Sequence, residues 1–319
     1  MNIMLTSYCN RHCPYCFAQA KLTQPGQDYK NSCLSLENLR VVMDFLKRSK
    51  VAHVGLIGGE PTLHPQFTKI VDTLLREKFN LKIFSNAVFS AEVAEFLHQR
   101  LKQPWAMLVN INAPETYTRE EWKKVIRALR LLKQKVSLGF NASRVAFNAG
   151  FLPPLVNKYK ISRLIRLGIA NPIVGIENEH IPLQSHARMS AGIVRFVEAC
   201  AKQNVWVSFD CGFTLCSFSD RQLGRLVRSG CRFGFHCAET IDVNCDLSLW
   251  RCFPTARLVN RRLTDFKDMR GIIDYYARKF TAFRRVGLMP KCRSCVYRRR
   301  RQCGGGCLAH IIRTFAVAA

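Results

Sequence analysis

The chain has 319 residues, of which 48% are hydrophobic and 22% are charged. A globular chain of this length buries about three quarters of the surface that its unfolded form exposes, so a substantial core is expected. No apolar run approaches the roughly 20 residues that span a bilayer, and the first residues lack the basic and apolar regions of a signal peptide. These features argue against a membrane protein and predict a cytoplasmic one.

Basic residues and cysteines are both unusually frequent. Lys and Arg total 49 against 22 Asp and Glu, a formal net charge of +27. Such a charge attracts polyanions, acidic peptides or phosphorylated molecules, although solubility alone is an equally good explanation. The 15 cysteines are too many for thiols that serve only as small apolar groups. In a reducing compartment, clustered cysteines indicate metal binding or catalysis.

Short apolar segments alternate with helical patterns over the first two thirds of the chain. Strands are predicted over residues 3–7, 51–57, 81–85, 105–111, 136–140, 164–169 and 205–209. Helices are predicted to begin at Ser35, Pro65, Ser90 and Thr118, and a further helix near residues 191–203. This alternation is typical of parallel βαβ units. After about residue 211 it stops, and Cys, Gly and Arg dominate.

Chemically useful residues follow the predicted strands, always at the same end. After the first six strands come, in order, three cysteines, Gly58-Gly59-Glu60-Pro61, Asn86, Asn112, Asn141 and Asn171. In a parallel α/β barrel or half-barrel, the carboxyl ends of the strands meet at one edge and carry the chemistry. The sequence therefore predicts a site at this edge.

Cys9, Cys13 and Cys16 form a Cys-x3-Cys-x2-Cys loop. Three thiolates suffice for three irons of a cubane cluster, and they leave a fourth iron open to the amine and carboxylate of a substrate. Zinc is the alternative, but a structural zinc site usually has four protein ligands, and the spacing of His12 and the cysteines fits none of the usual finger patterns. The motif therefore favours an iron–sulfur cluster.

This loop, with Tyr15 before its last cysteine, resembles the signature of the radical S-adenosylmethionine (radical SAM) superfamily. The segment Gly58-Gly59-Glu60-Pro61 is similar to the GGE element of that family, which lies against the amino group of S-adenosylmethionine. The physical chemistry agrees, because glycines permit a close approach of the backbone and a carboxylate accepts a hydrogen bond from an ammonium group.

Other polar residues are similar to family positions that contact the cofactor. Ser85-Asn86-Ala87 is similar to the T-N-G element, with two positions changed. Asn141 and Ser143 are similar to residues that hold the ribose, and residues 166–169 to a segment along the adenine. Ordinary loop capping is an equally good explanation of Asn86, Asn141 and Ser143.

The resemblance implies a fold, a set of cofactors and a reaction. The expected fold is α/β, a partial (β/α)6 TIM-type barrel over residues 1–210. The expected cofactors are S-adenosylmethionine and a [4Fe-4S] cluster on Cys9, Cys13 and Cys16, with an external electron donor of the flavodoxin or ferredoxin type. In the implied reaction, S-adenosylmethionine is cleaved reductively to a 5′-deoxyadenosyl radical, which takes a hydrogen atom from an unactivated carbon of the substrate.

The cysteines from residue 231 onward form a second pattern, Cys-x5-Cys-x14-Cys, then a gap, then Cys-x2-Cys-x7-Cys-x3-Cys. This pattern is similar to the auxiliary-cluster extension called SPASM, or to its shorter relative called twitch. The resemblance implies a loop-dominated iron–sulfur domain over residues 211–319. It assigns one [4Fe-4S] cluster to Cys231, Cys237, Cys252 and Cys307. It assigns a second cluster to Cys292, Cys295 and Cys303.

This chain departs from the family pattern in two ways. Seven residues stand where the family has five, and no cysteine follows Cys307. The second cluster therefore takes another ligand, has an open iron or is absent. The candidate ligands are His310, Cys211, Cys216 and Cys245, and Cys211 or Cys216 is also a candidate to replace Cys231 on the first cluster. A zinc ribbon is the alternative for this region, while Cys33 and Cys200 are expected to be buried apolar residues.

The expected function is the radical modification of a ribosomally made peptide, because many relatives with auxiliary clusters act on peptides. Since the chain opens at the first predicted strand, we expect a separate leader-peptide-binding protein, or leader recognition by the basic surface. The alternatives are a small-molecule dehydrogenase, epimerase or carbon-bond-forming enzyme, and a non-catalytic iron–sulfur or zinc protein. Residues 298–301 and 261–262 are arginines without a nucleic-acid fingerprint, so a solvated basic face is favoured, followed by an acidic peptide partner.

Overall fold

The structure is a computed structural model that describes residues 1–23, 32–237 and 240–316. The β-strands are β1 (Asn2–Met4), β2 (His53–Ile57), β3 (Asn80–Ser85), β4 (Met107–Asn110), β5 (Val136–Ala142), β6 (Leu164–Ile169), β7 (Trp206–Phe209), β8 (Ile241–Val243), β9 (Ser248–Arg251) and β10 (Arg261–Arg262). The α-helices are α1 (Leu36–Arg48), α2 (Phe67–Arg76), α3 (Ala91–Arg100), α4 (Arg119–Leu132), α5 (Leu152–Tyr159), α6 (His186–Ala201), α7 (Asp220–Arg228), α8 (Met269–Val286), α9 (Val296–Arg299) and α10 (Leu308–Ala316).

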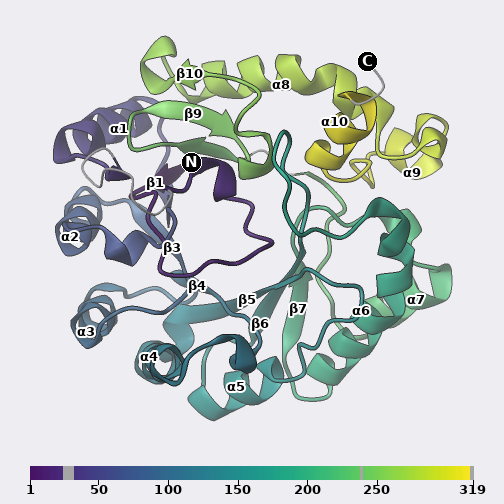
Figure 1. Cartoon of the computed structure of the whole chain (residues 1–319), viewed down its shortest axis with the longest axis horizontal. Helices are drawn as coiled ribbons and strands as arrows, with labels where there is room; N and C mark the ends of the chain where they lie inside the picture. The colour runs from purple at the N-terminus through teal and green to yellow at the C-terminus, as the bar shows by residue number, and fades with distance from the viewer. Residues whose placement is uncertain (24–31, 238–239, 317–319) are drawn as a thin grey trace.

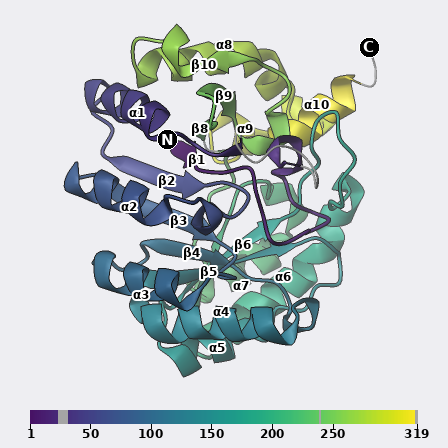
Figure 2. The same cartoon turned by 60° about the vertical axis from the view of Figure 1, so that its left-hand side comes forward.

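One curved sheet runs through the molecule in the order β10-β9-β8-β1-β2-β3-β4-β5-β6-β7. The pairings from β8 through β1 to β7 are parallel, whereas β9 and β10 continue the sheet with antiparallel pairings. Helices α1 to α6 cover the outer side of the sheet (Figure 1, Figure 2). The predicted α/β class, with a partial TIM-type barrel, is confirmed.

Side-chain caps begin several helices where the sequence predicts them. Ser35 Oγ accepts a hydrogen bond from the backbone N–H of Asn38 (3.0 Å) at the start of α1. Thr118 and Glu121 form a reciprocal capping box at the start of α4. Each cap satisfies backbone donors that the first turn leaves without a partner, so these residues fix where the helices begin.

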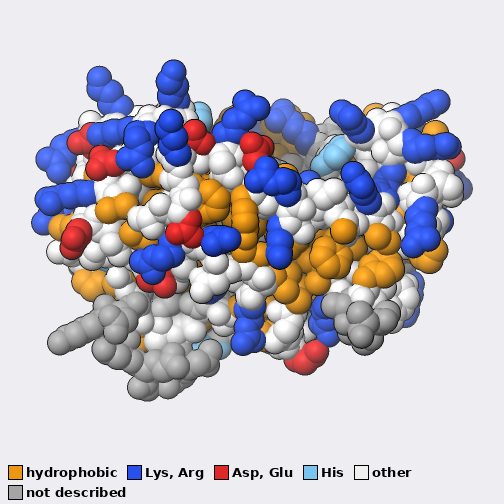
Figure 3. Space-filling view, turned by 90° about the horizontal axis from the view of Figure 1, so that it is seen from above, with side chains coloured by type: hydrophobic (Ala, Val, Ile, Leu, Met, Phe, Trp, Pro, Cys, Tyr) orange, Lys and Arg blue, Asp and Glu red, His pale blue; other side chains and the backbone are white. Residues whose placement is uncertain are grey.

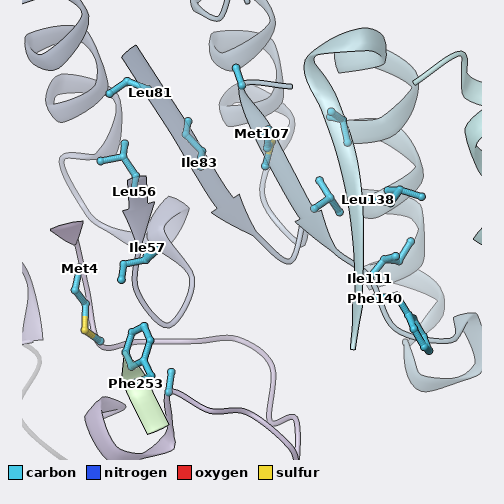
Figure 4. Packing of buried hydrophobic residues seen from close by; sticks show 14 of the residues in the cluster. Met4, Leu56, Ile57, Leu81, Ile83, Met107, Ile111, Leu138, Phe140 and Phe253 are labelled. Atoms are coloured by element: carbon cyan, nitrogen blue, oxygen red, sulfur yellow. The ribbon is translucent and has the colours of Figure 1, made fainter. Parts of the chain in front are cut away.

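The core lies between the sheet and the helices. Met4, Leu56, Ile83 and Leu138, from β1, β2, β3 and β5, have no exposed surface. Figure 4 shows Phe253, which follows β9, lying beside Met4. The C-terminal third therefore shares its core with the barrel strands.

The region after residue 211 contains more regular structure than its composition indicates. Strands β8 to β10 extend the sheet, and α8 is an amphipathic helix of 18 residues that buries Ile272, Tyr276 and Phe280. The three strands have two to four residues each, too few for a periodic pattern. In β8 a buried acid, Asp242, also interrupts the apolar run.

In the described residues, no helix has both the length and the apolar character that crossing a membrane requires.

Candidate functional site

The first three cysteines lie in the loop that follows β1 and crosses the middle of the molecule (Figure 1). The backbone N–H of Cys16 donates to the carbonyl of Cys13 (3.0 Å) and closes a tight turn. Two amides approach the sulfurs, Asn86 Nδ2 at 3.8 Å from Cys9 Sγ and Asn112 Nδ2 at 3.5 Å from Cys13 Sγ. Burial raises the pKa of Cys9 to about 12 and that of Cys16 to about 11, so metal binding must displace a proton from each thiol.

The second predicted element follows β2, and its Glu60 is fully buried. The carboxylate accepts hydrogen bonds from Thr62 Oγ1 (2.7 Å), Ser85 Oγ (2.8 Å) and the backbone N–H of Asn86 (2.7 Å). Burial raises the pKa of Glu60, and these donors oppose that effect. The side chain ties the end of β2 to the end of β3 and presents no surface to an ammonium group.

Gly59 brings the same segment against the cysteine loop. Its backbone N–H donates to the carbonyl of Thr6 (2.8 Å), and that of Glu60 donates to the carbonyl of Tyr8 (2.6 Å). A Cβ atom at Gly59 would lie 2.1 Å from the carbonyl oxygen of Tyr8. Glycine is therefore required by the contact that positions the backbone just before Cys9.

A cavity of about 660 Å³ opens beside the cysteine loop, which is an ordinary size for a ligand site. Cys13 and Tyr15 form one wall, and Asn112, Asn141 and Ser143 approach it from the ends of β4 and β5. The structure thus brings one predicted cluster ligand, Cys13, and the predicted ribose contacts Asn141 and Ser143 to one cavity at the carboxyl edge of the parallel strands, whereas Cys9 and Cys16 are not among the described residues that line it.

Other polar residues expected at this edge have different surroundings. Arg166 of β6 forms an ion pair with Asp210 (2.5 Å). Asn171 Nδ2 donates to the carbonyl of Ile169 (3.0 Å). Neither Arg166 nor Asn171 is among the described residues that line the cavity. Ser143 does line it, and its hydroxyl donates to Glu179 (3.4 Å).

Arg11 belongs to no sequence motif, yet it anchors the cysteine loop. Its guanidinium group donates to Glu121 (2.9 Å) and to the carbonyl of Thr116 (3.1 Å), and it lies 3.9 Å from the centre of the Tyr117 ring. These contacts tie the loop to the start of α4. No spacing in the sequence links residues 11 and 121, so only the tertiary structure reveals this role.

In the C-terminal third, Cys211, Cys237, Cys252 and Cys307 form a mutually interacting group. Burial raises the pKa of Cys252 well above its usual range, and the charges of Cys211, Cys307 and Cys237 raise it further. Burial also raises the pKa of Cys211, followed by the charges of Asp210, Cys307 and Cys237. The sequence places Cys211 among several spare cysteines, whereas the structure places it in this group.

Cys231 lies elsewhere, near the buried Cys200. The chain after Cys231 runs parallel to β7, because the N–H of Arg232 donates to the carbonyl of Val207 (2.9 Å) and Phe209 N–H donates back to Arg232 (2.8 Å). The bridge between Ser208 and Arg232 sets Cys231 beside Val207 of β7, whereas Cys237 follows the bridge between Phe235 and Cys303.

A second cavity, of about 320 Å³, lies in the C-terminal third. The described residues that line it include Cys216, Cys292, Cys295 and Cys303. Cys292 and Cys303 are buried, Cys295 is partly buried and Cys216 is exposed. Three predicted ligands thus face one space together with a cysteine from the loop after β7.

Among the described residues, no group of three or more His, Cys, Asp or Glu side chains is arranged to hold a metal ion. A zinc ion needs its thiolates within about 2.3 Å of a single point. The thiolates of a cubane cluster bind different irons and stand farther apart.

Residues 3–142 match the sequence profile of a family described as the Radical SAM superfamily. The curated relatives include "Mycofactocin maturase MftC" of Mycobacterium tuberculosis (strain CDC 1551 / Oshkosh), 33% identical over 91 residues, and "S-adenosylmethionine-dependent nucleotide dehydratase" of Selenomonas ruminantium, 34% identical over 87 residues. The matches cover 28% and 27% of this chain, and 22% and 29% of the relatives. The chain therefore matches less than a third of the length of each of these two relatives.

Two solved structures are similar over nearly the whole chain. SuiB of Streptococcus suis bound to S-adenosylmethionine superimposes with a TM-score of 0.64 at 14% identity, over 98% of this chain and 73% of that one. The structure of anSMEcpe with bound AdoMet has a TM-score of 0.60 at 18% identity, over 96% of this chain and 88% of that one. At such identities the likeness shows the fold. The profile match adds a sequence similarity of residues 3–142 to the radical SAM superfamily.

Proposed function

We propose that the chain is a radical SAM enzyme that modifies a ribosomally made peptide. When a [4Fe-4S] cluster is bound by Cys9, Cys13 and Cys16, it supplies the electron that cleaves S-adenosylmethionine to the 5′-deoxyadenosyl radical. The observation that carries this proposal is the position of the cysteine loop, which lies within the residues that match the radical SAM profile and places Cys13 in the wall of a cavity at the carboxyl edge of the sheet. An external donor of the flavodoxin or ferredoxin type reduces the enzyme.

The residues around the cavity have separate tasks in this proposal. Asn86 and Asn112 direct amide N–H groups at Cys9 and Cys13, and such hydrogen bonds tune the potential of a cluster. Asn141 and Ser143 hold the ribose. Glu60 acts as a positioning residue through the strand ends that it joins.

A peptide substrate is supported by the relatives and by the charge. MftC is named a maturase, and SuiB bound to the precursor peptide SuiA superimposes with a TM-score of 0.65 at 13% identity, over 98% of this chain. The net charge of +27 suits an acidic peptide. Lys and Arg are spread around the face in Figure 3 rather than gathered in one patch.

We also propose that residues 1–210 form the radical SAM part and residues 211–319 an auxiliary iron–sulfur part. In the auxiliary part, Cys237, Cys252 and Cys307 hold one [4Fe-4S] cluster. Cys211 is the fourth ligand in place of Cys231, because Cys211 interacts with the other three thiols while Cys231 lies beside β7 near Cys200.

The test is anaerobic reconstitution followed by the measurement of 5′-deoxyadenosine under a strong reductant. We expect the parent to form it and Cys13→Ala to lose this activity by at least about 100-fold, because even the loss of a residue that only supports a metal ligand costs about 10- to 100-fold. Cys33→Ala is the matched control, since Cys33 lies outside both cysteine groups. Formation of 5′-deoxyadenosine by Cys13→Ala at the parent rate contradicts the assignment.

The peptide class needs a separate measurement. The probe is the product of a short open reading frame for an acidic peptide beside the gene, synthesised with deuterium on its side chains. We expect deuterium to appear in 5′-deoxyadenosine and the mass of the peptide to change. If 5′-deoxyadenosine forms while the peptide stays unchanged, the peptide assignment is wrong and the radical chemistry stands.

A further inference from the structure

The second cavity differs from the site beside the cysteine loop in both its position and its lining. Its four cysteines come from separate segments that converge in the C-terminal third. Cys216 lies in a short turn of 3-10 helix, Leu215–Ser217, after β7. Cys292 lies in a similar turn, Pro290–Arg293, and Cys295 is the residue before α9. Cys303 follows α9, and its backbone pairs with that of Phe235 in an isolated parallel β-bridge.

A network of contacts holds three of these segments in place. The guanidinium group of Arg298 donates to the carbonyls of Arg285 (3.0 Å) and Val286 (3.1 Å) at the end of α8, and to that of Cys292 (3.3 Å). A cation at the C-terminus of a helix is also favoured by the helix dipole. Arg298 therefore fixes α9 and its flanking cysteines against α8.

Gly287 permits this close arrangement. Its φ is +75°, and a Cβ atom there would lie 2.6 Å from Cys292 Cβ and 2.7 Å from Arg298 Nη1. The next residue, Leu288, donates its N–H to the carbonyl of Gly305 (2.8 Å). The segment with Cys292 and the segment after Cys303 are thereby pinned together.

The other spare candidates for a fourth ligand have different surroundings. Cys211 interacts with Cys237 and Cys307. The thiol of Cys245 donates to the carbonyl of Met4 (3.3 Å), the last residue of β1. His310 faces two other histidines, with ring centres 5.8 Å and 5.4 Å away. None of these three candidates is among the described residues that line the cavity.

We propose that Cys216 is the fourth protein ligand of a second auxiliary [4Fe-4S] cluster, whose other ligands are Cys292, Cys295 and Cys303. The fourth ligand thus comes from upstream, from the loop after the last barrel strand. Four thiolates leave no iron of this cluster free to bind substrate. The inference rests on the proposed function only in taking the chain to be an iron–sulfur protein.

The experiment counts iron in the full-length chain after anaerobic reconstitution. On a Cys9/Cys13/Cys16 triple-alanine background, which removes the first cluster, we expect roughly eight irons per chain, four for each auxiliary cluster. Adding Cys216→Ala should lower the count to roughly four or leave a three-iron cluster, which has its own electron paramagnetic resonance signal. Cys245→Ser is the matched control and should keep the full count.

The irons that remain show whether the variant has folded. If Cys216→Ala loses both auxiliary clusters, Cys216→Ser is compared with it, because an oxygen ligand that preserves the cluster changes its spectrum. An unchanged count and spectrum in Cys216→Ala overturns the proposal, and so does zinc in place of iron or only four irons on the triple-alanine background. Cleavage of S-adenosylmethionine by the parent is measured separately, so failure of the proposed function is distinguishable from failure of this inference.

Discussion

At the scale of single residues, Glu60 ties two strands of the site together, because its buried carboxylate joins the ends of β2 and β3 beside the cysteine loop. The sequence predicts this residue as part of a cofactor-binding element, and it does lie at the expected edge. Its hydrogen bonds to Thr62, Ser85 and Asn86 could not be predicted, because they depend on how close two strand ends come. The sequence motif thus predicts where Glu60 lies, whereas its hydrogen bonds show which strand ends it joins.

Replacing Glu60 by Gln tests this positioning role. The amide presents an N–H group where a donor already points, so we expect a loss of about 1–3 kcal/mol of unfolding free energy. The measurement is urea denaturation, and iron retention by the cysteine loop is the second readout. Glu95→Gln, on the exposed face of α3, should change neither quantity. Full stability and full iron content in Glu60→Gln would contradict the role.

At the scale of the elements, β8 is a strand that the sequence does not predict. It pairs in parallel with β1, and Asn2 Nδ2 donates to Asp242 Oδ1 (2.7 Å) across the pairing. Burial raises the pKa of Asp242 to about 7. A carboxyl group that is protonated in the folded chain and ionised in the unfolded chain makes stability fall as pH rises, here from about 4 to about 7.

Asp242→Asn should remove this part of the pH dependence, since an amide keeps an oxygen acceptor for Asn2 and carries no charge. At pH 8 we expect the variant to be more stable than the parent by about 1–3 kcal/mol, because one pKa unit corresponds to about 1.4 kcal/mol. Thermal unfolding at a series of pH values measures the effect. Asp274→Asn, on the solvent side of α8, is the control. If stability depended on pH in the same way in Asp242→Asn and the parent, Asp242 would not be the source of this pH dependence.

The elements that the sequence predicts are those with long apolar patterns or polar caps. Strands β2 to β7 and helices α1, α3 and α4 carry such signals, and the structure contains them near the expected residues. Helix α5 has Pro153 and Pro154 in its first turn, where proline fits but suppresses a helical prediction.

For the candidate site, the cysteine spacing in the C-terminal third gives the number of candidate ligands. Which thiols share a cavity depends on the loop after β7, which no spacing describes.

At the scale of the whole molecule, a histidine cluster joins the barrel to the C-terminal helix. His186 at the start of α6 and His310 in α10 have ring centres 5.4 Å apart, and His180 lies 5.8 Å from His310. Burial, followed by the charges of His186, His180 and Arg313, lowers the pKa of His310 to about 3. The folded chain therefore keeps this ring neutral, whereas the unfolded chain protonates it near pH 6.5.

Because His310 is protonated more easily in the unfolded chain than in the folded one, acid weakens the contact between the barrel and the C-terminal helix. The contribution of His310 to the free energy of unfolding is fully present above about pH 6.5. It falls by up to about 1.4 kcal/mol per pH unit toward pH 3, because the unfolded chain binds a proton that the folded chain does not. In His310→Phe, we expect the loss between pH 7 and pH 5 to shrink by about 1–2 kcal/mol, with His186 retaining part of it. Denaturant midpoints at the two pH values measure the change, and His53→Gln at an exposed position is the control. An equal acid loss in His310→Phe and the parent would refute this account.

The parallel pairing of β1 with β8 also has a consequence for biosynthesis. One edge of β1 pairs with β2, and the other edge pairs with residues 242 and 243 of β8. On the ribosome, β1 therefore keeps one open edge until most of the chain has emerged, and contacts of such long sequence separation form slowly. An unpaired edge in that interval invites pairing with another nascent chain. Expression cut off after β7 should for this reason give aggregates, and slower elongation before residue 240, which lengthens that interval, should increase aggregation.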